Sequence, residues 1–272
     1  MRRLAVLGSP IAHSKSPGLH RAAYRLLGLD WEYSAVEMRG EDLAAFIGGL
    51  DDSWRGLSLT MPLKQDVLPL LDEVDELATL TGAANTVLFD GAARRGFNTD
   101  VGGIVRALAE AGCDRVRHGV LIGGGATAKS ALAAMAELGA ASVQILVRRP
   151  EAGAAIAELG HRLGLAVELS KLAELEGVAE AELLVSTVPG GTELGVEASA
   201  ALVRSAVLLD VAYAPWPTPL AAHWLGLGGT VVHGLGMLLH QALLQVRTFV
   251  AGDPFAVLPD EEAVLSVMRE TL

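Results

Sequence analysis

The chain has 272 residues, and its 21 Lys and Arg against 32 Asp and Glu give a formal net charge of −11. Hydrophobic residues make up 51% of the chain and charged residues 19%, which excludes an intrinsically disordered protein. At about 100–200 residues per domain, the length of the chain predicts one large domain or two ordinary ones. The acidic surplus argues against binding to nucleic acid or to an anionic membrane surface, but it allows a small anionic ligand, since local donors outweigh a distant field.

Cysteine, histidine and hydropathy exclude several further classes of protein. The single cysteine, Cys113, excludes an internal disulfide and a thiolate metal site, as is typical of the reducing cytoplasm, where we expect the protein to lie. The seven histidines show no ligand spacing, so no metal site is predicted. Residues 211–246 contain no Asp, Glu, Lys or Arg, but prolines, glycines and histidines interrupt them. This stretch is therefore predicted to form buried loop, strand and helix instead of a membrane span.

Strands alternate with helices along the first half of the chain. A helix is predicted after the first strand, with Ser16 as its N-cap and Pro17 at its first position, and another helix is predicted from about Glu41. Asp90-Gly91 predicts a hairpin turn between two strands. The strands of this half are expected at residues 4–7, 31–37, 56–60, 86–89 and 92–97.

The second half repeats this alternation more regularly. A helix over 99–111 that ends at Gly112 leads into it, and no repeat, low-complexity tract or flexible linker interrupts the chain. Strands are expected at residues 120–122, 142–147, 183–187, 206–211 and 230–232. Helices are expected at residues 127–138, 151–163, 235–250 and 261–272. The pattern predicts an α/β protein with parallel sheets.

A glycine-rich loop follows the strand at 120–122 and opens a helix. Glycines in a G-x-G-x-x-A pattern let the backbone turn tightly and approach a pyrophosphate, whose charge is stabilised at the helix N-terminus. The loop predicts a dinucleotide site formed by Gly123, Gly124, Gly125, Ala126, Thr127 and Ala128. The next strand ends in Arg148 and Arg149, where an NAD site usually carries an acidic residue. These arginines favour the 2′-phosphate of NADP, and the alternative is a solvated charge pair.

Polar side chains in the first half are suited to a small anionic substrate. Ser14 and Ser16 lie where a helix begins and could bind a carboxylate, although Ser16 could equally serve only as a cap. Lys64 is one of only four lysines, and an ammonium can exchange a proton where a guanidinium effectively cannot. The alternative interpretation of Lys64 is a lysine on the exposed surface of a helix. Asp100 begins the helix at 99–111 and could merely face its dipole.

Taken in order, the motifs of the chain resemble those of the shikimate dehydrogenase family. The resemblance covers nearly the whole chain and includes the glycine loop. Its other motifs are GSPIAHSKSPGLH (8–20), SLTMPLK (58–64), GAANT (82–86), GFNTD (96–100), DVAYAPWPTPL (210–220) and GLGMLLHQ (234–241). The resemblance implies two α/β domains: a substrate-binding domain at 1–101 and a Rossmann-like NADP-binding domain at 102–232. C-terminal helices at 233–272 would pack back on the substrate domain.

The resemblance also implies roles in the reversible reduction of 3-dehydroshikimate to shikimate by NADPH. Lys64 and Asp100 would form the catalytic pair, and the proton would be carried by Lys64, Asp100 or water. The substrate would be held by Ser14, Ser16, Thr60, Asn85, Tyr213 and Gln241, with the two serines on its carboxylate. The cofactor would be held by the glycine loop together with Arg148, Arg149 and Gly234.

The cofactor strand departs from the family's usual pattern. Arg148 fits the motif, but Ala152 stands where a later arginine is common, and Arg149 could compensate. Two other functions are open: an NAD-dependent quinate/shikimate dehydrogenase and a non-catalytic NADP-binding regulator. Ser16 and the absence of an acidic residue at 147–149 argue against the first, and the presence of both members of the catalytic pair argues against the second. Activity on aminoshikimate-type substrates is also open, and the family implies a monomer or a homodimer.

Overall fold

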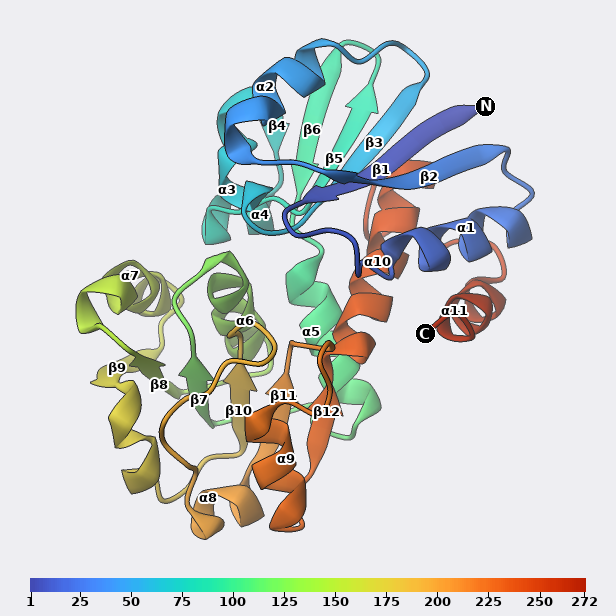
Figure 1. Cartoon of the computed structure of the whole chain (residues 1–272). Helices are drawn as coiled ribbons and strands as arrows, with labels where there is room; N and C mark the ends of the chain where they lie inside the picture. Colours follow the sequence, from blue (N-terminus) through green and yellow to red (C-terminus); the bar gives the residue numbers. More distant parts are fainter. The chain divides into compact units, whose positions relative to one another are not determined.

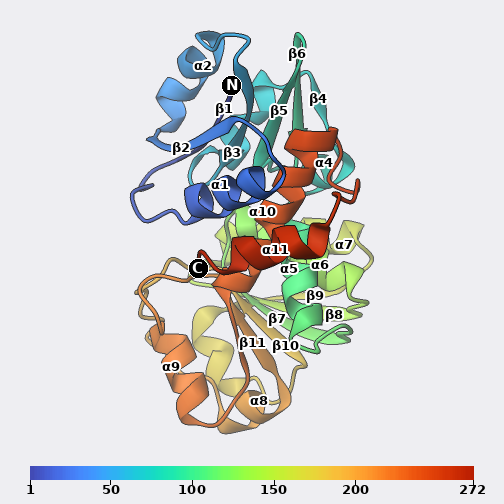
Figure 2. The same cartoon turned by 90° about the vertical axis from the view of Figure 1, so that its right-hand side faces the viewer.

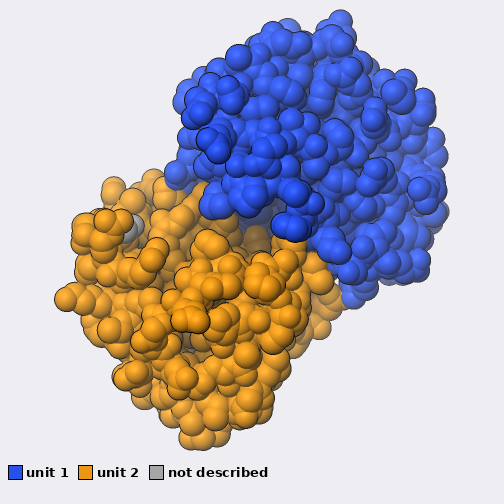
Figure 3. Space-filling view, viewed as in Figure 1, with its two compact units in different colours: residues 1–103, 238–272 blue, residues 104–237 orange. Residues whose placement is uncertain are grey.

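The computed structural model describes residues 1–151 and 153–272, and the chain divides into two compact units. Unit 1 comprises residues 1–103 and 238–272, and unit 2 comprises residues 104–237 (Figure 3). Each unit contains a six-stranded sheet flanked by helices, so the prediction of an α/β protein is confirmed (Figure 1).

The sheet of unit 1 is mixed, in the order β2-β1-β3-β5-β6-β4. Its strands are β1 (Arg2–Gly8), β2 (Trp31–Glu37), β3 (Trp54–Leu59), β4 (Glu73–Val74), β5 (Thr86–Asp90) and β6 (Ala93–Phe97). β1 runs parallel to β2 and β3, whereas β5 runs antiparallel to β3 and β6. The expectation of parallel sheets is therefore wrong for this unit. The predicted hairpin is confirmed, with a φ of 61° at Gly91, and it reverses the chain between β5 and β6.

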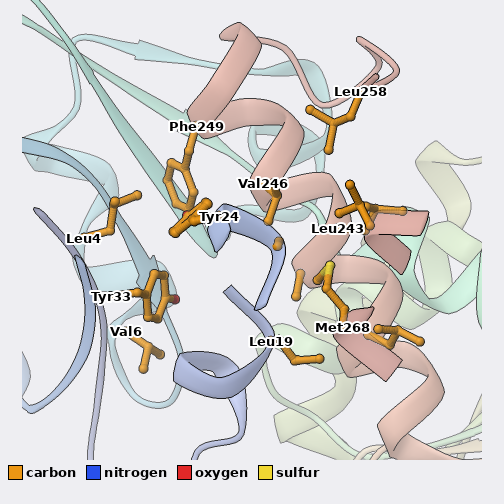
Figure 4. Close-up of a cluster of buried hydrophobic side chains, with 14 of the residues drawn as sticks. Leu4, Val6, Leu19, Tyr24, Tyr33, Leu243, Val246, Phe249, Leu258 and Met268 are labelled. Atoms are coloured by element: carbon orange, nitrogen blue, oxygen red, sulfur yellow. The ribbon is translucent and has the colours of Figure 1, made fainter. Parts of the chain in front are cut away.

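Helices cover both faces of this sheet. Side chains alternate across β1, so that Leu4 and Val6 join one buried cluster and Ala5 and Leu7 join another. The first cluster packs under α1, α10 and α11 (Figures 2 and 4), and the second packs under α2, α3 and α4. The helical segments of this unit are α1 (Ser16–Leu26), α2 (Gly40–Gly48), α3 (Leu63–Asp66), η1 (Leu68–Leu70), α4 (Glu76–Thr81) and α11 (Glu261–Arg269). The two helices shared with unit 2 are α5 (Asp100–Glu110) and α10 (Gly234–Ala251).

The sheet of unit 2 is fully parallel, in the order β12-β11-β10-β7-β8-β9. Its strands are β7 (His118–Ile122), β8 (Ser142–Val147), β9 (Ala166–Lys171), β10 (Leu183–Ser186), β11 (Val207–Asp210) and β12 (Val231–His233). This is the strand order of a doubly wound dinucleotide-binding fold, whose two halves diverge at the neighbouring strands β7 and β10. β9 is missing from the predicted strands because it lies at the edge of the sheet and only its Ser170 is buried.

Helices also cover both faces of the second sheet. α6 and α7 pack on one face, and η3, α8 and α9 pack on the other around the buried Trp224 (Figure 1). These segments are α6 (Ala126–Glu137), η2 (Pro150–Gly153), α7 (Ala154–Arg162), η3 (Leu172–Gly177), α8 (Ala200–Ser205) and α9 (Pro219–Gly226). The helices expected at 127–138 and 151–163 are confirmed as α6 and as η2 followed by α7. The short helices α8 and α9 are additional to the prediction.

Two sequence features with alternative interpretations are placed by the structure. Residues 211–246 form a loop, α9, β12 and the greater part of α10, as expected. None of the helices in the described part of the chain combines the length and hydropathy needed to span a bilayer. Cys113 is a buried free thiol, and the described residues include no group of three or more His, Cys, Asp or Glu placed to hold a metal ion.

Candidate functional site

One edge of the unit 1 sheet gathers the polar segments that the sequence singles out. Because β5 runs antiparallel to its neighbours, its beginning lies beside the ends of β3 and β6, where Thr86 pairs with Ser58 and with Phe97. The connections that follow β1 and β3 leave to opposite faces of the sheet, toward α1 and α3. Open α/β sheets bind ligands at such a point, outside the carboxyl ends of their strands.

Lys64 and Asp100 form a short ion pair at this edge, with 2.6 Å between Lys64 Nζ and Asp100 Oδ2. Lys64 lies on α3, shortly after β3, and Asp100 begins α5, where Asn98 Oδ1 accepts a hydrogen bond from the Asp100 N–H. The two side chains are only 13% and 5% exposed. Asp100 therefore does more than face the dipole of α5, because its carboxylate holds an ammonium group that is largely withdrawn from water.

Asn85 joins this ion pair to helix α10. Its Nδ2 donates to Asp100 Oδ1 at 2.8 Å and to Gln241 Oε1 at 3.2 Å. Its Oδ1 accepts from the Thr99 N–H at 2.9 Å, which fixes the side of the amide that faces Asp100, because a backbone N–H can only donate. The structure thus brings four sequence-predicted residues into one bonded group, which we name the Lys64 cluster: Lys64, Asn85, Asp100 and Gln241.

Ser14 and Ser16 lie at the start of α1, but the predicted cap is wrong by one position. The N-cap of α1 is Lys15, and Ser16 is the first helical residue. Ser14 Oγ accepts from the Ser16 N–H at 3.3 Å and so takes over part of the capping role expected of Ser16. The reason is local: the helix starts one residue earlier than expected, with Pro17 in its first turn. The Ser16 hydroxyl is therefore not used as a cap.

Thr60 lies directly after β3, beside the loop that leads to the two serines. A Cβ atom at Gly8 would come within 2.2 Å of Thr60 Cγ2 and 2.9 Å of Met61 O, so only a glycine permits this close approach. The Ser9 N–H donates to Met61 O at 2.9 Å and ties the two loops together. The loops that follow β1 and β3 thus begin side by side at the edge that holds the Lys64 cluster.

The glycine loop of unit 2 lies at the corresponding point of its own sheet, between β7 and β10. Gly123 has a φ of 131°, and a Cβ atom there would come within 2.0 Å of Thr187 Oγ1, so a side chain is excluded on both grounds. α6 begins at Ala126 with Gly125 as its N-cap and no side-chain cap. The helix dipole favours an anion at this helix start, which carries no side-chain cap.

The other predicted cofactor residues near this helix start follow β8 or lie in the loop and in the first turn of α6. Arg148 and Arg149 follow β8, the strand next to β7, and both are exposed. Neither arginine forms an ion pair with another described residue, so both guanidinium groups are available to a phosphate. Ala152, the position where the chain departs from the family, lies outside the described residues. The remaining members lie in the loop and in the first turn of α6: Gly124, Thr127 and Ala128.

Tyr213, predicted to bind the substrate, and Gly234, predicted to bind the cofactor, belong to unit 2, whereas the other five predicted substrate-binding residues belong to unit 1. Asp210 ties down the loop that carries Tyr213, because its carboxylate accepts from the Ala212 N–H and from the Thr218 hydroxyl. Partial burial raises the pKa of Tyr213, which keeps its hydroxyl protonated. A Cβ atom at Gly234 would come within 2.3 Å of a backbone oxygen of the same loop, so glycine is required there.

Several polar residues beneath the Lys64 cluster are absent from the sequence prediction. Each is at most 3% exposed and hydrogen-bonded within unit 1: His20, Tyr24, Tyr33, Ser58, Thr86 and Gln245. One sequence signal was available, since Gln245 lies one helical turn after Gln241 on α10. Polar residues inside apolar strands, such as Ser58 and Thr86, are a second, weaker signal.

Buried His20 makes the stability of the protein depend on acid pH. Burial lowers its pKa from 6.5 to about 3, so that between these values the unfolded chain binds a proton that the folded protein does not. Lowering the pH from 6 to 4 should therefore cost the wild type about 2 kcal/mol more unfolding free energy than it costs His20→Gln. Urea unfolding of both proteins at the two pH values measures this difference. An identical pH dependence would show that His20 is not the titrating group.

The sequence of the chain is similar to that of shikimate dehydrogenases. A family model for the shikimate dehydrogenase substrate binding domain matches residues 6–87. The shikimate dehydrogenase (NADP(+)) of Methanothermobacter thermautotrophicus is 33% identical over 257 residues, which cover 92% of this chain and 91% of the relative. That of Geobacter metallireducens is 35% identical over 270 residues, which cover 93% and 92%.

Solved structures give the same result. The shikimate dehydrogenase of Mycobacterium tuberculosis matches 99% of both chains with a TM-score of 0.86 and 40% identity. A shikimate 5-dehydrogenase of Thermus thermophilus, solved in complex with NADP(H) and shikimate, matches 100% of both chains with a TM-score of 0.84 and 32% identity. Identity at this level over nearly complete chains, together with the shared fold, shows common membership. The chain belongs to the shikimate dehydrogenase family.

Proposed function

We propose that this protein is an NADP-dependent shikimate dehydrogenase, which reversibly reduces 3-dehydroshikimate to shikimate on the route to chorismate and the aromatic amino acids. The observation that carries the proposal is the Lys64–Asp100 ion pair of 2.6 Å at the ligand-binding edge of unit 1. Membership of the family supports it, as do the NADP(+) in the names of the relatives and the NADP(H) and shikimate bound by the Thermus thermophilus enzyme.

The substrate is proposed to bind at the edge of unit 1 that holds the Lys64 cluster. Ser14 and Ser16 would bind its carboxylate, because hydroxyl donors and the positive end of α1 stabilise an anion. Such local donors are needed, since the net charge of −11 opposes an anionic ligand at longer range. The hydroxyls and the ring would be contacted by Thr60, Asn85, Tyr213 and Gln241.

Lys64 and Asp100 are together proposed to stabilise the developing charge and to assist proton transfer at the reacting C3–oxygen bond. NADPH, when bound, supplies the hydride that reduces C3. As negative charge develops on the oxygen of this bond, the Lys64 ammonium stabilises it and can donate a proton to it. Asp100 orients Lys64 through their hydrogen bond and accepts another from a substrate hydroxyl. The proton that completes the new hydroxyl comes from Lys64, Asp100 or water.

The cofactor is proposed to bind at the glycine loop of unit 2. The start of α6 fits a pyrophosphate because it lacks a side-chain cap and because Gly123 brings the backbone close to Thr187. The exposed Arg148 and Arg149 fit a 2′-phosphate. The full proposed set consists of Gly123, Gly124, Gly125, Ala126, Thr127, Ala128, Arg148, Arg149 and Gly234.

Replacing Arg148 with alanine should weaken the use of NADPH more than that of NADH. Only NADPH carries the 2′-phosphate, so losing one charged hydrogen-bond donor should raise its KM about 10-fold and change the KM for NADH less than about twofold. Steady-state kinetics with both cofactors measures the split. Arg149→Ala removes the neighbouring exposed arginine and is measured in the same way, so that the effect of Arg148→Ala can be compared with the loss of an adjacent arginine. Equal changes for the two cofactors in Arg148→Ala would show that Arg148 does not read the 2′-phosphate.

A steady-state comparison of shikimate and quinate with NADP and with NAD tests the proposed function. The expected result is that NADPH with 3-dehydroshikimate gives much the fastest turnover. Faster turnover with NADH and quinate-series substrates would favour the NAD-dependent quinate/shikimate dehydrogenase instead. NADP binding without turnover of any of these substrates would favour the non-catalytic NADP-binding regulator.

A cytoplasmic location and a monomeric or homodimeric state are part of the same proposal. Size-exclusion chromatography tests the oligomeric state.

A further inference from the structure

A continuous hydrogen-bond network lies beneath the Lys64 cluster, inside the apolar core of unit 1. We name it the Gln245 network, and its members are His20, Tyr24, Tyr33, Ser58, Thr86 and Gln245. Two of its members, Tyr24 and Tyr33, belong to the buried cluster shown in Figure 4. Burying this many polar groups is costly unless every one of them is bonded, so the directions of the bonds are strongly constrained.

The upper end of the network supplies a further donor to Asn85 Oδ1, beside the Thr99 N–H. Gln245 donates from Nε2 to the backbone oxygen of Asn85 at 3.1 Å and to Thr86 Oγ1 at 3.1 Å. The backbone oxygen can only accept, so the nitrogen of the Gln245 amide must be on this side. Because Thr86 Oγ1 accepts from Gln245, its single proton is donated to Asn85 Oδ1 at 2.9 Å. Asn85 Nδ2 is then directed at Asp100 Oδ1 at 2.8 Å.

The lower end of the network fixes Gln245 itself. Gln245 Oε1 accepts from Ser58 Oγ at 2.8 Å and faces His20 Nε2 at 3.2 Å. Burial keeps His20 neutral above a pKa of about 3, so its ring carries one proton. Because Gln245 Oε1 can only accept, this proton lies on Nε2, and Nδ1 accepts from the Tyr24 hydroxyl at 3.0 Å. Tyr33 in turn donates to Ser58 at 2.6 Å. All the bonds therefore run in one direction, from two tyrosine hydroxyls toward the Asp100 carboxylate.

We propose that Gln245, acting through Thr86 and together with the Thr99 N–H, is a positioning residue that holds the Asn85 side-chain amide as the donor to Asp100. With Oδ1 of Asp100 occupied by Asn85, Oδ2 is left to orient Lys64. Gln245 makes no hydrogen bond to Lys64 or to Asp100, so any effect on the reaction passes through Asn85. The inference rests on the proposed function of the Lys64–Asp100 pair.

The test compares Thr86→Val with Thr86→Ser in the full-length protein. Valine has the shape of threonine but can neither accept from Gln245 nor donate to Asn85. We expect Thr86→Val to lower kcat for shikimate oxidation by NADP about 10-fold with the KM for shikimate changed less than about threefold. Thr86→Ser keeps the hydroxyl and should recover kcat to within about threefold of the wild type. Gln245→Met should lower kcat in the same way. If Gln245→Met does not fold, Thr86→Val alone decides the question.

Tyr33→Phe is the matched control. It also removes one buried hydroxyl bond of the network, but at the far end, and leaves every bond to Asn85 in place. We expect its thermal stability to fall about as much as that of Thr86→Val, while its kcat stays within about twofold of the wild type. The proposal is overturned if Tyr33→Phe lowers kcat as much as Thr86→Val does, or if Thr86→Val keeps the wild-type kcat.

A readout without turnover separates this inference from the proposed function. The side-chain amide protons of Asn85 can be followed by NMR in the ligand-free protein, where the side chain is 2% exposed. They should exchange slowly with solvent in the wild type and in Thr86→Ser, and at least about 10-fold faster in Thr86→Val. Equal exchange in all three proteins contradicts the positioning role. If the three proteins show the expected exchange rates but the wild type has no dehydrogenase activity, the proposed function is contradicted and the positioning role of Gln245 is not.

Discussion

Lys64→Ala is expected to lower kcat about 1,000-fold while changing the KM for shikimate less than about fivefold. The Lys64 ammonium is the only positive group bonded to Asp100 in the described structure, so the developing negative charge on the substrate oxygen loses its stabilising partner. Binding should suffer little, because the substrate carboxylate is proposed to be held by Ser14 and Ser16. Steady-state kinetics, with shikimate binding measured by calorimetry, checks both parts.

Two further variants sharpen this result. Lys64→Arg keeps a positive charge but effectively cannot give up a proton, so its kcat should stay at least about 100-fold below that of the wild type. Lys171→Ala removes an exposed lysine of unit 2 and should leave kcat unchanged, which controls for the loss of a lysine as such. If Lys64→Ala retains a kcat near that of the wild type, Lys64 has no part in the chemistry.

Elements set by neighbouring residues were predicted closely from the sequence. The glycine loop is an example, since β7, the loop and α6 follow one another without interruption and the φ of 131° at Gly123 requires glycine. The hairpin at Asp90-Gly91 is another, because its turn requires a positive φ that Gly91 supplies. In both cases the determining contacts lie close together along the chain.

Elements that depend on distant contacts were predicted less well. β9 lies at a sheet edge and is mostly exposed, so it has no apolar run to mark it. The four-residue α3, which carries Lys64, is too short to show a helical period, and the two-residue β4 is visible only through its pairing with β6. The one-residue error at the start of α1 is of a different, local kind, since Ser14, only two residues away, supplies the bond expected of Ser16.

The candidate site shows the same division. The resemblance supplied Lys64 and Asp100, and the structure brings them to 2.6 Å although they lie 36 residues apart in the chain. No motif pointed to Gln245, whose partners Ser58 and His20 are 187 and 225 residues away. Apart from its place one helical turn after Gln241, nothing local marks Gln245, because its bonds join α10 to α1, β3 and β5 and form only in the folded chain.

Asp100→Asn is expected to lower kcat/KM about 300-fold, although asparagine has nearly the shape of aspartate. Both Asp100 oxygens accept hydrogen bonds, one from Lys64 and the other from Asn85. An asparagine at this position would turn an NH₂ group toward one of these donors, so one bond would be lost and the Lys64 ammonium would lose its counter-charge. Steady-state kinetics measures the loss, and circular dichroism confirms that the variant is folded.

The decisive measurement for the pair is the double variant Lys64→Ala/Asp100→Asn. If Asp100 acts by holding Lys64 in position, removing it from a protein that already lacks Lys64 has little left to disturb. The kcat/KM of the double variant should then fall no more than about threefold below that of Lys64→Ala alone. Losses that multiply would contradict this coupling and would show that Asp100 acts mainly through the hydrogen bond that it is proposed to accept from a substrate hydroxyl. The 2.6 Å ion pair in a site that is almost closed to water predicts the coupled result.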